Sequence, residues 1–180
     1  MSDIAAELTK LHHLKGADYS RQVEHIARMS DFHPVNEESG IFSTGKGSNA
    51  DYGNLLNAAR KAVAHGFKVY ILPNPSLTKT PDFIFERKGV FRLIELKTIQ
   101  GSSSVSNRLM DSTGQSNHVL LNMTTRYNGG LLAVQIKSYF EQNEQALEVL
   151  IFKGKDLISI KRRFVFQRDF VRKFRKEFGK

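Results

Sequence analysis

Residues 80–98 have the sequence TPDFIFERKGVFRLIELKT. Two apolar-rich runs flank Lys88 and Gly89, and both are typical of β-strands. A polar residue followed by glycine between two such runs predicts a two-residue hairpin turn. The segment therefore predicts a β-hairpin in which Arg87 pairs with Val90.

The register of this hairpin brings two carboxylates together. Counting back along both strands from the turn places Asp82 opposite Glu95. Directly opposed side chains have Cβ atoms about 4.5–5.5 Å apart, and like charges so placed destabilise the pair unless a cation lies between them. Since side chains alternate along a strand, Lys97 shares the face of Glu95, and the opposite face carries Ile94, Leu96 and Thr98.

Asp82, Glu95 and Lys97 are the residue types that phosphodiester hydrolysis uses. Carboxylates bind a hard cation such as Mg²⁺, which activates water, and an ammonium group stabilises the charge that develops on the phosphate. The three residues therefore predict the catalytic centre of a metal-dependent phosphodiesterase. The alternative is an amphipathic hairpin in which Lys97 only neutralises a neighbouring carboxylate.

The flanking sequence favours the catalytic interpretation. Residues 50–65 predict a helix that ends at Gly66, and FKVYILP (67–73) predicts a buried strand. After the hairpin, a polar loop leads to a predicted helix over 105–116 and to the strand HVLLNM (118–123). This arrangement, with PD at 81–82 and ELK at 95–97, resembles the PD-(D/E)xK nuclease superfamily.

Within that superfamily the chain looks most similar to the tRNA-cleaving C-terminal toxin domains of contact-dependent inhibition proteins and to related domains of mobile elements. The similar segments are AARKAVAHGFKVYILP (58–73), TPDFIF (80–85), LIELKT (93–98) and RLMDSTGQSNHVLL (108–121). The resemblance covers residues 47–162. It implies an α/β fold with a restriction-endonuclease-like core, a mixed central sheet flanked by helices, and metal-dependent endonuclease activity.

The resemblance also implies roles for further residues. The backbone carbonyl of Leu96 would join Asp82 and Glu95 as a metal ligand, with Mg²⁺ as the expected metal and Mn²⁺ and Zn²⁺ as alternatives. The polar turn after ELK makes Gln100 and Ser103 candidates to bind the substrate. In the resembling families a basic residue and a Gln on the next helix face the site, which implies substrate binding by Arg108 and Gln115, seven positions apart on one predicted helical face.

One feature departs from the family pattern. Many members carry a Glu on the first helix, whereas ADYGNLLNAAR (50–60) contains none. Asp51 and Asn54 are the candidates to support the site from that helix. The missing Glu leaves open a catalytically silent nucleic-acid-binding module, and a DNA endonuclease of the same superfamily is the other alternative.

Charge and composition bear on partners and compartment. The last twenty residues contain nine Lys or Arg against two acidic residues, so they carry +7 of the formal net charge of +9. This favours a nucleic-acid partner. The family resemblance implies tRNA or other RNA before DNA as the substrate, and it adds a cognate inhibitor protein. The absence of cysteine and of any long apolar segment predicts no membrane partner and fits a cytoplasmic site of action. The resemblance implies delivery as part of a larger toxin.

The remaining pattern predicts the organisation of the chain. We expect a helical extension and loop over 1–45, the nuclease-like domain over 46–162, and a basic helix within 163–180 that docks through Phe170, Phe174 and Phe178. Residues 131–136 fit a strand or a helix, 139–147 fit a helix, and LEVLIF (147–152) and LISIKR (157–162) fit strands. Of the six histidines, only His118 is expected near the site.

Overall fold

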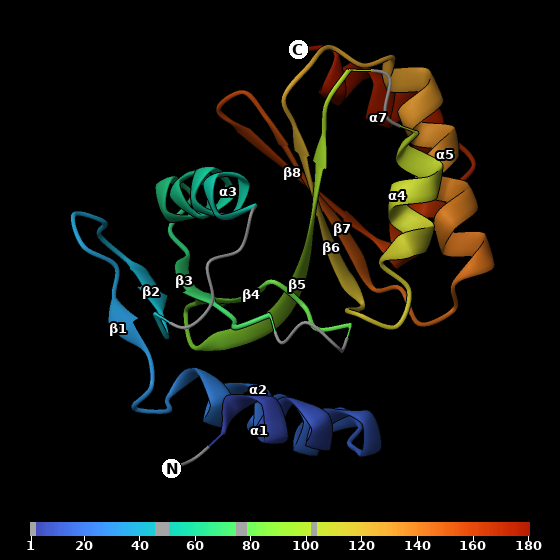
Figure 1. Ribbon diagram of the computed structural model, residues 1–180. Helices are drawn as coiled ribbons and strands as arrows, with labels where there is room; N and C mark the ends of the chain where they lie inside the picture. Colours follow the sequence, from blue (N-terminus) through green and yellow to red (C-terminus); the bar gives the residue numbers. More distant parts are fainter. Residues whose placement is uncertain (1–2, 46–50, 75–78, 102–103) are drawn as a thin grey trace. The chain divides into compact units, whose positions relative to one another are not determined.

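The computed structural model describes residues 3–45, 51–74, 79–101 and 104–180 (Figure 1). The chain forms two compact units, Met1–Ile94 and Glu95–Lys180. The long strand β5 (Val90–Ile99) contributes to both. Each unit combines helices with β-strands, so the fold is α/β, as expected. No helix in the described ranges has the length and apolar character that a membrane crossing requires.

The first unit has helices on both sides of its strands, with α1 and α2 on one side and α3 on the other (Figure 1). The strand pairs β1–β2, β3–β4 and β4–β5 are antiparallel, whereas β2 and β3 are parallel. The elements of this unit before β5 are α1 (Ile4–Lys10), the 3-10 turn η1 (Leu11–His13), α2 (Gly16–Ala27), β1 (His33–Pro34), β2 (Ile41–Ser43), α3 (Tyr52–Ala64), β3 (Lys68–Ile71) and β4 (Phe83–Arg87).

Apolar spacing explains how these helices pack. Val23 and Ile26 of α2 are buried together with Ile84 of β4 and Leu93 of β5 in one hydrophobic cluster. The helix α3 ends one residue before His65, and the positive φ of 84° at Gly66 is the left-handed conformation that glycine adopts most readily at a helix end. The predicted helix end is therefore confirmed.

The hairpin of β4 and β5 has the predicted turn and register. Lys88 and Gly89 have φ of 53° and 76°, as a type I′ turn requires at both central positions. The Gly89 amide donates to Glu86 Oε1 at 2.9 Å, which supports the turn. The ladder runs from Arg87 opposite Val90 to Phe83 opposite Ile94, so the predicted pairing is confirmed over these residues.

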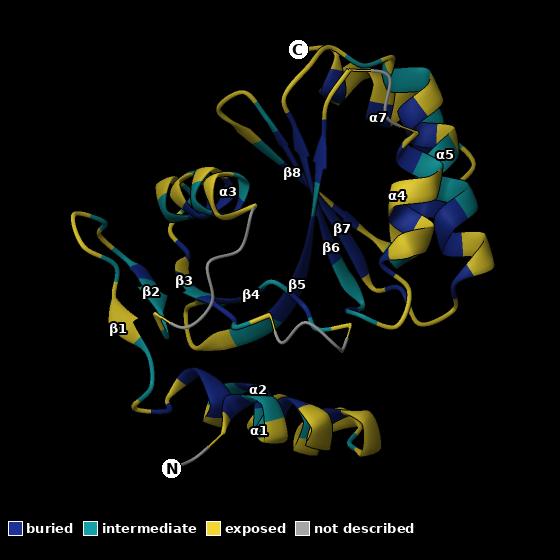
Figure 2. Ribbon diagram, viewed as in Figure 1, coloured by how far each residue is buried: buried dark blue, intermediate teal, exposed yellow. Residues whose placement is uncertain are grey.

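The second unit is built on parallel strands. From β5 to β7 each strand is parallel to the next, and β8 pairs antiparallel with β7. Helices α4, α5 and α7 cover the face of these strands that carries Val119, Leu121 and Ile151, and Figure 2 shows β6 and β7 largely buried. The elements after β5 are α4 (Val105–Asp111), β6 (His118–Met123), α5 (Gly129–Gln142), β7 (Glu148–Lys153), β8 (Asp156–Lys161), α6 (Arg162–Val165) and α7 (Phe170–Phe178).

Two predicted helices end earlier than expected, and a third segment adopts the helical one of its two predicted conformations. The helix expected over 105–116 ends at Asp111, and Gly114 adopts a φ of 83° in the turns that follow. Residues 131–136 lie inside α5, which begins where the Asn128 side chain accepts a hydrogen bond from the Leu131 amide at 2.9 Å. The helix expected over 139–147 is the end of α5 and stops at Gln142, because Asn143 leaves the helical conformation and its side chain accepts from the Gln145 amide.

The basic C-terminal helix forms as expected and is anchored by its phenylalanines. Phe170, Phe174 and Phe178 are 7%, 3% and 5% exposed and belong to the core of the second unit. Burying each such side chain contributes about 1.5–3 kcal/mol. The opposite side of α7 carries four exposed cations, Arg172, Lys173, Arg175 and Lys176. The short helix α6 was not predicted.

Candidate functional site

Asp82 lies in the first unit, immediately before β4. Its backbone is held on both sides, because its amide donates to the Ile94 carbonyl at 3.0 Å and its carbonyl accepts from the Leu72 amide at 2.9 Å. Asp82 therefore continues the bonding pattern of the hairpin by one residue. In the chain, Glu95 is the residue that follows Ile94.

Glu95 and Lys97 lie in the second unit, on one face of β5. Lys97 Nζ is 2.7 Å from Glu95 Oε1, and the side chains are 14% and 4% exposed. Glu95 pairs with Val119 and Lys97 with Leu121, so both side chains are on the face that α4 and α5 cover. The prediction that they share a face is confirmed, and together they form a largely buried ion pair.

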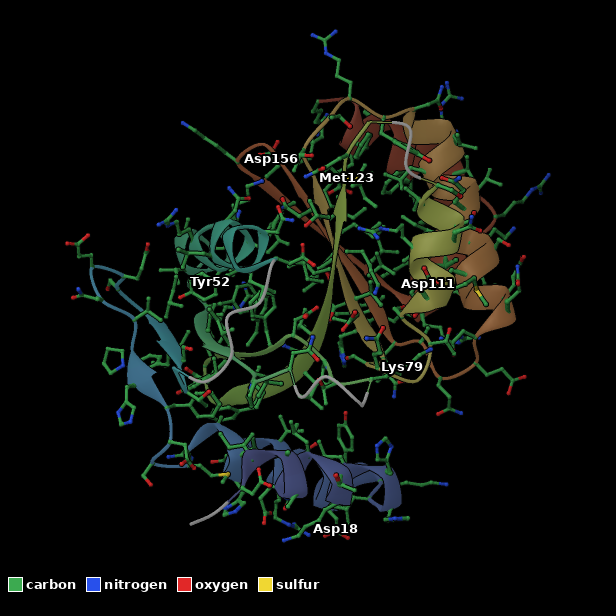
Figure 3. All side chains as sticks on the ribbon, in the orientation of Figure 1. Asp18, Tyr52, Lys79, Asp111, Met123 and Asp156 are labelled. Atoms are coloured by element: carbon green, nitrogen blue, oxygen red, sulfur yellow. The ribbon has the colours of Figure 1, made fainter. Side chains whose placement is uncertain are left out.

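The segment around α4 brings two more predicted residues to this face. Gln115 Oε1 accepts from Lys97 Nζ at 3.4 Å, and Arg108 Nη2 donates to the Thr98 carbonyl at 3.0 Å. The prediction that Gln115 shares a helical face with Arg108 was wrong. Helix α4 ends at Asp111, which is labelled in Figure 3, and Gln115 lies four residues beyond that end. Through its hydrogen bond to Thr98, Arg108 ties α4 to β5.

The other predicted residues occupy different positions. Gln100 is exposed just after β5, Leu96 is buried within that strand, and Ser103 falls outside the described residues. Asp51 is the residue before α3, where its side chain makes no capping hydrogen bond, and Asn54 is half-buried in the first turns of that helix. Their roles in a site stay predictions.

The structure adds a buried carboxylate that the sequence analysis did not identify. Glu148, at the start of β7, is 7% exposed, accepts a hydrogen bond from Ser159 Oγ and lies 3.9 Å from His118 Nε2. His118 directly precedes Val119, whose side chain shares the face of Glu95, so strand alternation places His118 and Glu148 on the opposite face. The expected place of His118 near the site stays a prediction. The sequence signal for Glu148 is an acidic residue directly before the apolar run 149–152. The sequence analysis predicted only a strand for this segment.

The donor set suits a hard divalent cation. Carboxylates and backbone carbonyls are the ligands that Mg²⁺ prefers, and Asp82, Glu95 and the Leu96 carbonyl are donors of these kinds. Within the described residues, no group of three or more His, Asp and Glu side chains is arranged to hold a metal ion. Metal binding by Asp82, Glu95 and the Leu96 carbonyl therefore stays a prediction.

Comparison with known proteins gives one solved structure to report. No protein-family model and no curated protein matches the chain. A chain of a CdiA-CT/CdiI toxin and immunity complex from Burkholderia pseudomallei is similar in structure to this protein. The match covers 65% of this chain and 91% of the matched chain, with 15% sequence identity and a TM-score of 0.44.

Proposed function

We propose that the chain is a metal-dependent endonuclease of the PD-(D/E)xK type, with Asp82, Glu95 and Lys97 as its catalytic residues. The observation that carries the proposal is the buried Glu95–Lys97 pair, with Gln115 on the same ammonium group. The order α3, β3, β4, β5, α4, β6 also supports it, since the first three strands pair antiparallel and β5 and β6 pair parallel across a helix.

Asp82, Glu95 and the Leu96 carbonyl would hold the metal, with Mg²⁺ first and Mn²⁺ or Zn²⁺ as alternatives. A bound divalent cation supplies a water of lowered pKa and neutralises charge on the phosphate. Asp82 would then lie opposite Glu95, one residue beyond the Phe83–Ile94 pair. The hydrogen bond from the Asp82 amide to the Ile94 carbonyl supports this register.

Lys97 is the residue that acts on the substrate in this proposal. Its ammonium group has three donors, and Glu95 and Gln115 accept from it at 2.7 and 3.4 Å. These acceptors orient the ammonium group, which stabilises the negative charge on the scissile phosphate by charge-assisted hydrogen bonding. The Arg108 guanidinium uses one donor on the Thr98 carbonyl, and its remaining donors would position the substrate together with Gln100 and Ser103.

The proposed substrate is RNA, with tRNA favoured. The exposed cations of α7 give the second unit a face that attracts a polyanion. A cognate inhibitor protein and a cytoplasmic site of action after delivery within a larger toxin complete the proposal. The second candidate is a catalytically silent nucleic-acid-binding module, which is favoured by Asn54 on α3 where related nucleases carry Glu.

The test is incubation of the purified protein with tRNA, other RNA and duplex DNA, with Mg²⁺, Mn²⁺, Zn²⁺ or EDTA. We expect metal-dependent cleavage of RNA that Asp82→Asn, Glu95→Gln and Lys97→Gln each reduce by roughly a hundredfold or more. Asp111→Asn, an exposed charge change on α4, is the matched control and should cleave normally. Cleavage of DNA alone would replace RNA as the substrate, and binding without cleavage would favour the silent module.

A further inference from the structure

A second polar feature of the second unit lies away from the proposed catalytic residues. A cavity of about 390 Å³ is bounded by the loop after β6, the start of α5, the end of β7 and α7. In Figure 1 the start of α5 and the helix α7 lie at the same end of this unit. Met123, labelled in Figure 3, ends β6 two residues before the first lining residue, Thr125. The cavity therefore lies beyond the carboxyl ends of the parallel strands β6 and β7, where α/β sheets commonly bind ligands.

The charge of the cavity lining is uniformly positive. Arg126, Lys153 and Arg175 line it, and none of the described lining residues is Asp or Glu. Lys153 is partly engaged, since its ammonium group donates to the Phe178 carbonyl and lies 4.7 Å from the Phe178 ring centroid. Arg126 and Arg175 are exposed, and no carboxylate of the described chain lies within 4 Å of either.

This lack of compensation distinguishes Arg175 from two other cations of α7. Lys173 and Arg172 lie 2.8 and 3.7 Å from Asp169 Oδ2. Arg175 is directed instead toward the start of α5, because a Cβ placed on Gly130 would come within 3.4 Å of its Cδ and Nε. Two guanidinium groups with free donors thus stand at the cavity, where a doubly hydrogen-bonded oxyanion would offset their repulsion.

The backbone adds donors to the same cavity. Gly129 and Gly130 are the first two residues of the 14-residue helix α5, and their amides have no intrahelical acceptor. Both glycines line the cavity, and a Cβ on Gly129 would come within 3.0 Å of Phe178 Cδ1. Glycine at these positions lets α7 pack closely while the backbone stays accessible.

We propose that this cavity binds a phosphate group of a nucleic-acid strand, at a site separate from the proposed catalytic residues. The choice of nucleic acid as the source of the phosphate rests on the proposed function, whereas the oxyanion chemistry rests on the cavity itself. Arg126 and Arg175 pair with the phosphate oxygens through charge-assisted bonds. Lys153 and the α5 amides complete the positive surroundings.

The test measures binding in EDTA, so that it does not depend on cleavage. A fluorescein-labelled single-stranded RNA is titrated with wild type, with Arg126→Gln/Arg175→Gln, and with the control Lys137→Gln/Lys176→Gln. The control removes the same charge from the half-buried Lys137 on α5 and the exposed Lys176 on α7, and neither residue lines the cavity.

Loss of one phosphate contact should lower the slope of log affinity against log salt by about 0.7, which corresponds to roughly fivefold weaker binding near 0.1 M salt. We expect this loss in the cavity variant and a smaller one in the control. Equal losses in both variants would overturn the proposal, because the general positive field would then explain binding.

A second measurement identifies the ligand at the cavity. Titration of the ¹⁵N-labelled protein with inorganic phosphate, AMP and the RNA should shift the Gly129 and Gly130 amide resonances in a saturable way. RNA with and without a 5′-phosphate separates a terminal phosphate from a backbone one. Absence of shifts with every probe would overturn the site, and stronger shifts with polyglutamate than with RNA would overturn the nucleic-acid assignment. Either result stands apart from whether the protein cleaves RNA.

Discussion

Lys97 Nζ lies 2.7 Å from Glu95 Oε1, and both side chains are largely withdrawn from solvent. Removing one partner of a buried ion pair leaves the other charge without compensation and typically costs about 3–5 kcal/mol. We therefore expect Lys97→Met to lower the free energy of unfolding by about that amount in EDTA, measured by urea denaturation.

The double variant Glu95→Gln/Lys97→Met isolates the coupling between the two residues. Its loss of stability should be smaller than the sum of the two single losses, since no uncompensated charge remains. Lys137→Met provides the control, because its exposed partner Glu141 is 4.0 Å away and such pairs contribute less than about 1 kcal/mol. Additive losses at Glu95 and Lys97 would show that the pair is not coupled.

Substitutions of Arg108 and of Gln115 should differ in their effects on stability and on cleavage. Arg108→Ala removes the bond to the Thr98 carbonyl and should cost about 1 kcal/mol of stability, in addition to raising KM for RNA. Gln115→Ala removes only the 3.4 Å contact to Lys97 and should reduce kcat with little change in the melting temperature. The check is steady-state kinetics beside thermal denaturation, and a normal kcat in Gln115→Ala would remove that residue from the proposed site.

Metal binding can be tested without an activity assay. Isothermal titration calorimetry with Mn²⁺ should show one binding event in wild type that Asp82→Asn and Glu95→Gln each weaken at least about tenfold, as loss of a ligand carboxylate requires. Asp111→Asn should bind as wild type does. Undiminished binding in Asp82→Asn would place the metal elsewhere.

Tyr139 should make stability fall at alkaline pH. Burial raises the pKa of its phenol, although hydrogen bonds with Ser112 and Asn143 lower it in part. Because the folded pKa is raised, the neutral phenol stabilises the fold fully below the ordinary pKa of about 10, and this stability is lost as pH rises through the folded pKa.

Tyr139→Phe cannot ionise and should lose less stability than wild type between pH 9 and 11 in urea denaturation. At neutral pH it should be less stable by about 1 kcal/mol, because the Asn143 amide loses its acceptor. A parallel alkaline decline in both proteins would assign the effect to other groups, such as Tyr19 and Tyr70, whose pKa values burial also raises.

Local sequence was enough to predict the hairpin and one half of the candidate site. The turn at Lys88 and Gly89 depends on two residues that accept positive φ, and the shared face of Glu95 and Lys97 follows from strand alternation alone. The end of α3 at Gly66 and the buried phenylalanine stripe of α7 are equally local, because each depends on spacing within one element.

Only the tertiary structure decided what those elements meet. Gln115 reaches Lys97 although the helix assumed to carry it ends at Asp111, since the turns after α4 and its packing on β5 set that contact. Arg126, Lys153 and Arg175 lie far apart in the sequence and line one cavity because α7 docks against the start of α5. Contacts of this kind depend on which elements pack together, and a pattern confined to one element holds no information about its partner.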